Sequence, residues 1–160
     1  MAGKTQAPKV KLEAAGSGRE ISLDAPGAPL VLALATRETT ELVPPFRAAL
    51  RERFPDPEKT IIASVADTHG VPRLMRKVAR GALSKRYEEM AAGLAPGQDP
   101  AAYIVILPDW SGKVAVELGI GELGTQLTVA VIGSTGEVAG TYTGDEPVEA
   151  AAELLDALGG

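Results

Sequence analysis

The sequence contains no cysteine, one histidine and few aromatic residues, which make up 4% of its 160 positions. The absence of cysteine excludes disulfides, thiolate catalysis, iron–sulfur clusters and most structural zinc sites. Long apolar runs are also missing, because the two longest span only residues 30–35 and 101–107. A membrane-spanning helix needs roughly 20 apolar residues. We therefore expect a chain that does not cross a membrane.

The first 18 residues are polar and lack the apolar stretch of a secretory signal. From this we expect a soluble, cytoplasmic protein. An apolar content of 45% over 160 residues suffices for one domain with a sizeable core. We predict a loose tail over residues 1–8, where no periodic pattern is present, and a single domain over residues 9–160.

Charge is divided unevenly along this chain, whose formal net charge is −5. Residues 1–86 hold fifteen of the sixteen Lys and Arg residues and nine acids, a balance of +6. Residues 87–160 hold Lys113 against twelve acids, a balance of −11. Such a distribution can steer a partner or align two copies of the chain, unless folding interleaves the two halves.

Several segments have the patterns of β-strands. Apolar and polar residues alternate over 10–13 and 20–23, and a glycine-containing connection joins them, which predicts an N-terminal hairpin. The continuous apolar segments 30–35 and 103–107 predict strands that are buried on both faces, and so does the β-branched segment 60–66. Two more predicted strands flank the Gly-Ser-Thr-Gly turn at 133–136, which is typical of a second hairpin.

Predicted helices separate these strands. Leu42, Phe46, Leu50 and Phe54 recur at helical spacing and predict a helix over 39–53, with two prolines in its first turn. Further helices are expected over 71–94, 113–118 and 148–158. Strands that alternate with helices predict an α/β fold, with a central mixed sheet and helices on both faces. Right-handed crossovers make the strands ending near residues 35 and 66 parallel neighbours, so their C-terminal ends share one edge.

Two segments carry a family resemblance: residues 29–46 (PLVLALATRETTELVPPF) and residues 127–144 (LTVAVIGSTGEVAGTYTG). The first is similar to the strand, active-site turn and proline-containing helix of thioredoxin-like proteins, in their redoxin, peroxiredoxin and TlpA-like branch. The second is similar to the late hairpin of the same family. The resemblance implies a thioredoxin-like fold over residues 9–158.

The same resemblance places the family's redox Cys-x-x-Cys motif on Thr36-Arg37-Glu38-Thr39, and the cis-proline opposite it on Leu127 or Thr128. Threonine hydroxyls form no disulfide and have no redox couple near biological potentials. A cis bond before a residue other than proline costs about 3 kcal/mol, so we expect a trans peptide there. The resemblance thus implies a partner-binding groove at Thr36–Thr39 and Leu127–Thr128 that persists without redox activity.

An enzymatic alternative uses Thr36 or Thr39 as a nucleophile, His69 as its base and Asp67 as the acid that orients the base. The strand order brings Thr36 and Asp67 to neighbouring strand ends. The competing interpretation is structural: the threonines, together with Asp67 or Thr68, cap helices, and His69 is an ordinary loop residue. The sequence leaves both open.

Between residues 73 and 86, the predicted long helix carries six basic residues and no acid. Four of them form one stripe at 100° per residue: Arg73, Arg76, Lys77 and Arg80. The other side of the helix is apolar and consists of Leu74, Met75, Val78, Ala79 and Ala82. The stripe suits an acidic partner, or it is a solvated face that acids of the C-terminal half oppose. A pI near 5.0 argues against nucleic acid as the partner.

Three further features carry little functional weight. The Gly-x-Gly-x-x-Gly spacing at 119–124 precedes a predicted strand, whereas a dinucleotide site requires it to follow a strand and open a helix. Trp110 lies in the turn 109–112 and is expected to cover the edge of the core. One histidine and scattered carboxylates give no metal-ligand spacing, and we expect no cofactor. We predict a redox-inactive module that binds a protein or peptide, with association of copies through edge strands as a further alternative.

Overall fold

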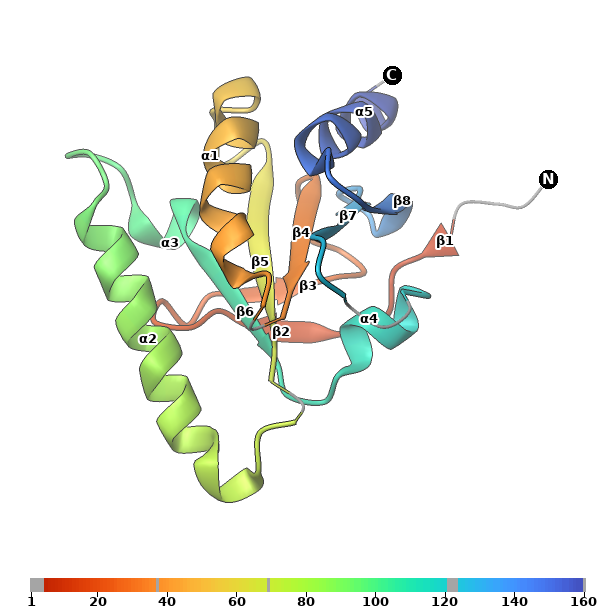
Figure 1. Cartoon of the computed structure of the whole chain (residues 1–160). Coiled ribbons are helices and arrows are strands. Elements are labelled where there is room, and N and C mark those ends of the chain that lie inside the picture. Colours follow the sequence, from red (N-terminus) through yellow and green to blue (C-terminus); the bar gives the residue numbers. More distant parts are fainter. Residues whose placement is uncertain (1–4, 37, 69, 121–123, 160) are drawn as a thin grey trace.

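The computed structural model describes residues 5–36, 38–68, 70–120 and 124–159 (Figure 1). Over these residues one mixed sheet has the strand order β1-β8-β7-β4-β5-β6. Its strands are β1 (Thr5–Gln6), β4 (Leu30–Ala35), β5 (Ile61–Asp67), β6 (Val105–Asp109), β7 (Thr128–Ile132) and β8 (Glu137–Thr143). β4, β5 and β6 pair in parallel, whereas β7, β8 and β1 are added by antiparallel pairing.

The predicted parallel pairing of the two central strands is confirmed. Leu30 pairs with Ile61 and Ala35 with Ala66, so that Thr36 and Asp67 follow at the same edge of the sheet. The residues of β4 point alternately to the two faces, and all six are buried. Burial on both faces explains why this strand reads as a continuous apolar run rather than as an alternating one.

Both faces of the sheet are covered, as the sequence predicts. On one face α1 (Val43–Arg53) and α5 (Pro147–Gly159) pack their apolar side chains, among them Phe46, Leu50 and Leu155. The hairpin of β2 (Lys11–Glu13) and β3 (Glu20–Ser22) covers the other face, together with α4 (Lys113–Glu117). The result is a mixed sheet with helices on both faces and an N-terminal hairpin.

The predicted helix over 39–53 is divided into η1 (Thr40–Leu42) and α1. Pro44 lies in the first turn of α1, where the missing N–H removes no intrahelical hydrogen bond. Leu42 precedes α1 and is 44% exposed. The buried face of α1 therefore begins at Val43, one residue later than the periodicity predicts.

The predicted long helix over 71–94 is also shorter. Pro72 is extended, with ψ of 145°, and η2 (Arg73–Met75) leads from it into α2 (Arg76–Ala92). None of the side chains of α2 is buried, and Figure 1 shows the start of this helix projecting from the body of the molecule. A short helix that the sequence analysis missed, α3 (Pro100–Tyr103), follows Asp99, whose carboxylate accepts from the Ala101 amide at 3.2 Å.

Part of the predicted loose tail is ordered. Thr5 and Gln6 pair with Val138 and Glu137 of β8, and the Ala7 amide donates to the Gly136 carbonyl at 2.7 Å. Two residues are too few to show the alternating pattern of a strand. Their extended conformation comes from pairing with β8, which the local sequence does not reveal. No helix in the described part of the chain combines the length and the apolar character needed to span a bilayer.

Candidate functional site

The loop that leaves β4 is closed by its own threonines. The Thr36 amide donates to Thr39 Oγ1 at 2.9 Å, and the Glu38 amide donates to Thr36 Oγ1 at 3.2 Å. The two hydroxyl oxygens are 3.4 Å apart. Thr39 occupies the N-cap position of η1, but its side chain makes no capping bond and bonds back to Thr36 instead. Arg37 lies outside the described residues.

The side chains opposite this loop are buried. Leu127 and Thr128 are each 2% exposed, and Thr128 Oγ1 lies 2.8 Å from Thr143 Oγ1. All peptide bonds of the described residues are trans, as expected for Leu127–Thr128. Thr39 is also buried, at 1%. Among the described residues, the groove implied by the resemblance therefore offers a partner only the side chains of Thr36 and Glu38.

A pocket of about 400 Å³ lies between α1 and α2, at the C-terminal end of β5. Thr36, Asp67 and Thr68 all line it. The predicted position of Thr36 and Asp67 at neighbouring strand ends is confirmed by the parallel register of β4 and β5. Thr39 is not among the lining residues, and His69 lies outside the described ones. The hydroxyls of Thr36 and Thr39 are engaged within their own loop, which argues against the nucleophilic interpretation of this cluster. The predicted helix capping is wrong as well. Thr39 makes no capping bond, and η2 and α2 have Pro72 and Met75 at their N-caps rather than Asp67 or Thr68.

Two arginines give the same pocket a positive charge. Arg47 of α1 and Arg86 of α2 line it, and neither forms an ion pair with a described residue. Burial lowers the pKa of Arg47 below its ordinary value, and the charges of Arg86 and Arg51 lower it further. Arg51 is anchored elsewhere, since its Nη1 donates to the carbonyls of Phe54 and Thr60.

The predicted basic stripe is present at the start of α2. The guanidinium carbons of Arg76 and Arg80 lie 5.7 and 5.2 Å from the centroid of the Trp110 ring, within cation–π range. Arg73 and Lys77 are exposed. None of the four forms an ion pair with a described residue, so the alternative in which C-terminal acids oppose the stripe has no support over this part of the chain.

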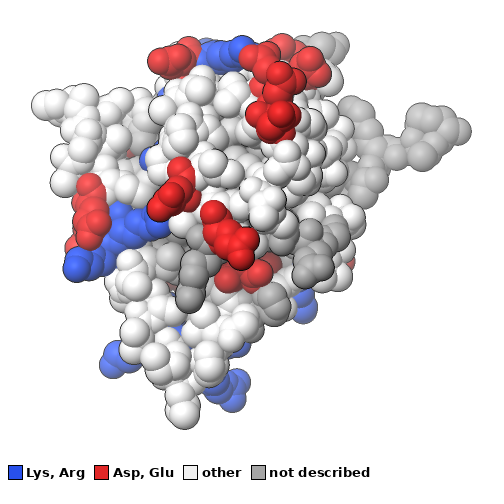
Figure 2. All heavy atoms as spheres, in the orientation of Figure 1, with Lys and Arg blue, Asp and Glu red and all other residues white. Residues whose placement is uncertain are grey.

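The apolar side of the same segment is open to solvent, whereas an amphipathic helix is expected to bury it. Leu74 is 95% exposed, Val78 64% and Met75 49%. We define the α2 end surface as these three residues together with Arg73 and Lys77. In Figure 2 the projecting end of the molecule is white with blue at its sides and shows no red. Periodicity identifies an apolar side but not what covers it, so the sequence could not reveal this exposure.

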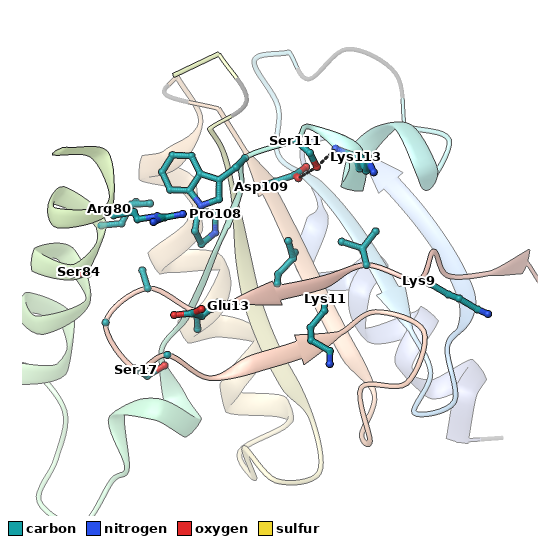
Figure 3. A pocket seen from close by; sticks show the side chains of 18 residues that line it. Lys9, Lys11, Glu13, Ser17, Arg80, Ser84, Pro108, Asp109, Ser111 and Lys113 are labelled. Atoms are coloured by element: carbon teal, nitrogen blue, oxygen red, sulfur yellow. Dashed lines mark hydrogen bonds between the residues drawn. The ribbon is translucent and has the colours of Figure 1, made fainter. Parts of the chain in front are cut away.

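A second pocket, of about 760 Å³, separates α2 from the N-terminal hairpin. Figure 3 shows Arg80 reaching from α2 toward Pro108 at the end of β6, above the hairpin strand that carries Glu13. Asp109 is buried and accepts from the Val114 amide at 3.0 Å, which fixes the predicted turn and starts α4. The sequence analysis missed this pocket because its walls are far apart in the chain.

The structure also bears on the glycine-rich segment and on metal-ligating residues. The glycine-rich segment 119–124 lies between α4 and β7 and so precedes a strand; residues 121–123 are outside the described part. Over the residues that the structure describes, no cluster of three or more His, Asp or Glu side chains has the arrangement of a metal site.

Comparison with known proteins identifies the fold. No family model and no curated protein matches the sequence. Solved structures do match. The exposed lipoprotein thioredoxin Etrx1 from Streptococcus pneumoniae has a TM-score of 0.63 and 18% identity, over 94% of this chain and 100% of its own. A thioredoxin-family thiol:disulfide interchange protein from Chlorobium tepidum has a TM-score of 0.61 and 14% identity, over 100% and 99%. The chain has a thioredoxin-like fold.

A third structure of this kind, StoA from Bacillus subtilis, has a TM-score of 0.57 and 17% identity, over 92% of this chain and 98% of its own. The thioredoxin-like fold expected from residues 29–46 and 127–144 is thus confirmed. Thiol–disulfide exchange needs sulfur atoms that this chain does not contain. At these identities the likeness shows the fold, and the cytoplasmic location stays a prediction.

Proposed function

We propose that this chain is a redox-inactive thioredoxin-like module that binds a protein or peptide partner through the α2 end surface. The observation that carries the proposal is the exposure of Leu74 and Val78, at 95% and 64%, beside Arg73 and Lys77. Single exposed apolar residues are ordinary, but three within five positions on a projecting segment are typical of an interaction site.

The charges of this surface define the partner's chemistry. Arg73, Arg76, Lys77 and Arg80 lie beside the exposed apolar side chains, and the described residues supply no ion-pairing acid. A complementary segment would bring leucine-like side chains to Leu74 and Val78 and carboxylates to Arg73 and Lys77. We therefore propose an acidic, amphipathic segment of a partner protein.

Trp110 contacts two of the arginines beside this surface. Because Arg76 and Arg80 both stack on its ring, the first turns of α2 are held against the end of β6. Side chains that are already held in one geometry lose less conformational entropy when a partner binds. The role that the resemblance gave to Leu127 and Thr128 is then limited to shaping the sheet edge, since both side chains are buried.

The proposal is tested with a fluorescent, helix-forming peptide that has leucines along one face of the helix and glutamates beside them. A matched peptide has lysine in place of glutamate. We expect anisotropy to show binding of the acidic peptide only. Replacing Leu74 and Val78 by serine removes two apolar contacts and should weaken binding by tenfold or more. Charge reversal of Arg73 and Lys77 should weaken it further and reduce its salt dependence.

Two control variants keep the test specific. Val116 is 74% exposed on α4, away from this surface, so Val116→Ser should leave peptide binding unchanged. Glu38→Lys alters the loop edge instead. Equal loss of binding in Val116→Ser and Leu74→Ser/Val78→Ser, or binding that depends on Glu38 alone, would refute the α2 end surface as the contact.

A further inference from the structure

The inner side of α2 is a mostly apolar stripe that the rest of the protein covers only in part. Five of its residues line the 400 Å³ pocket at positions i, i+3, i+4, i+7 and i+11: Ala79, Ala82, Leu83, Arg86 and Met90. This spacing places them on one face of the helix. Yet no residue of α2 is buried. Packing of an apolar face usually supplies most of a helix's stability in a protein, so this face lacks its usual cover.

The opposite walls of the pocket are apolar as well. Val43 of α1, Val65 of β5 and Ile106 of β6 contribute to them. The volume, about 400 Å³, lies in the range of small-molecule sites, roughly 300–1,000 Å³. Such sites combine apolar walls with a few polar groups that orient the ligand.

The polar groups of this pocket are of two kinds. Arg47 of α1 and Arg86 of α2 both line the pocket, and neither has an ion-pair partner among the described residues. The Thr68 side chain, 7% exposed, also lines the pocket, and its hydroxyl has no hydrogen-bond partner in the described part of the chain. Buried polar atoms are normally bonded, so an unpartnered hydroxyl beside two unpaired cations marks an incomplete site.

We propose that this pocket binds a small apolar carboxylic acid, whose carboxylate pairs with Arg47 and Arg86 and whose apolar body contacts the inner side of α2. Carboxylates accept paired hydrogen bonds from guanidinium groups, which makes them suitable anions for two arginines. A dianion such as phosphate would be less suitable, because the apolar walls penalise the burial of a second charge.

An anionic ligand also suits the electrostatic surroundings of Arg47. Burial and the charges of Arg86 and Arg51 lower the pKa of Arg47, which means that its cationic form is less favourable here than in an exposed arginine. An anion between Arg47 and Arg86 reverses that effect by placing an opposite charge beside both. The site is separate from the α2 end surface, which lies at the start of the same helix.

Isothermal titration calorimetry with decanoate, below the concentration at which decanoate forms micelles, tests whether the pocket binds an apolar carboxylate. Decanol and inorganic phosphate serve as the uncharged and the purely anionic probes. We expect decanoate to bind at least tenfold more tightly than decanol, and phosphate to show no measurable binding. Arg47→Gln with Arg86→Gln should weaken decanoate at least tenfold and leave decanol unchanged, because each charge-assisted hydrogen bond lost is worth about tenfold or more.

Matched variants keep the result interpretable. Lys85→Gln removes an exposed charge beside Arg86, and it should leave decanoate binding unchanged. Arg86→Gln alone provides the same test if the double variant does not fold. Equal affinity for decanoate and decanol, equal loss with Lys85→Gln, or no binding of decanoate to the wild-type chain would overturn the proposal. Peptide binding at the α2 end surface is independent of all three outcomes, so the two proposals fail separately.

Discussion

The Thr39 hydroxyl accepts a hydrogen bond from the Thr36 amide at 2.9 Å, across the turn that leads from β4 into α1. In proteins of this fold that carry the redox motif, two cysteines occupy the positions that the resemblance assigns to these threonines. Here the pair has a structural role, because the buried Thr39 side chain satisfies a backbone amide that no strand partner reaches.

Loss of this hydroxyl should destabilise the fold. Thr39→Val keeps the shape of the side chain but leaves the Thr36 amide without its acceptor, which costs about 1–3 kcal/mol for a buried group. Urea unfolding measures the free energy of unfolding. Thr39→Ser retains the acceptor and should lose less than half as much; equal losses in the two variants would show that the methyl group, and not the hydrogen bond, is what matters.

The same geometry predicts that a disulfide can be introduced. The hydroxyl oxygens of Thr36 and Thr39 are 3.4 Å apart, so sulfur atoms in their places need only small torsional changes to reach the S–S bond length of about 2.05 Å. The variant T36C/T39C should oxidise to an intramolecular disulfide with oxidised glutathione, as measured by thiol titration and mass. T36C/T40C shifts the second cysteine by one residue and should oxidise less readily. The opposite order would show that the motif is assigned one residue out of register.

The centre of the sheet was predictable because strands such as β4, β6 and β7 are buried on both faces and are therefore largely apolar, as residues 30–35 show. The turn at 133–136 was predictable from its glycines. β1 and α3 were not: Thr5–Gln6 is a strand only because β8 lies beside it, and α3 has a single turn. A strand that forms only because it pairs with a distant segment has no signature in its own local sequence.

Two leucines of this chain give a direct test of the burial pattern. Leu32 is fully buried in β4, whereas Leu74 is 95% exposed in η2. Leu32→Ala leaves a cavity in the core and should lower the free energy of unfolding by about 2–5 kcal/mol. Leu74→Ala removes no packed contact and should change it by less than about 0.5 kcal/mol. A large effect of Leu74→Ala, measured in urea, would mean that Leu74 is covered in solution, for example by a second copy of the chain.

The candidate sites were only partly predictable. The convergence of Thr36 and Asp67 followed from parallel strand order, and the cations of α2 followed from helical spacing. The presence of Arg47 and Arg86 in the walls of one pocket could not be inferred, because the distance between two helices depends on side chains from elsewhere in the fold. For the same reason the sequence did not show that Leu74 faces solvent.

The connection between the N-terminal hairpin and α2 depends on Gly16. Its φ is +79°, and a Cβ at this position would lie 2.3 Å from the Tyr87 ring. Gly16→Ala should therefore destabilise the chain through both backbone strain, about 1–2 kcal/mol, and steric conflict with α2. Gly97 has a similar φ of +89° but open space around it, so Gly97→Ala should cost only the strain. In a Tyr87→Ala background the two glycine substitutions should cost the same, because the conflict is gone and the cycle isolates the Gly16–Tyr87 contact. If Gly16→Ala remained more costly there, the hairpin would be held against α2 by something other than this ring.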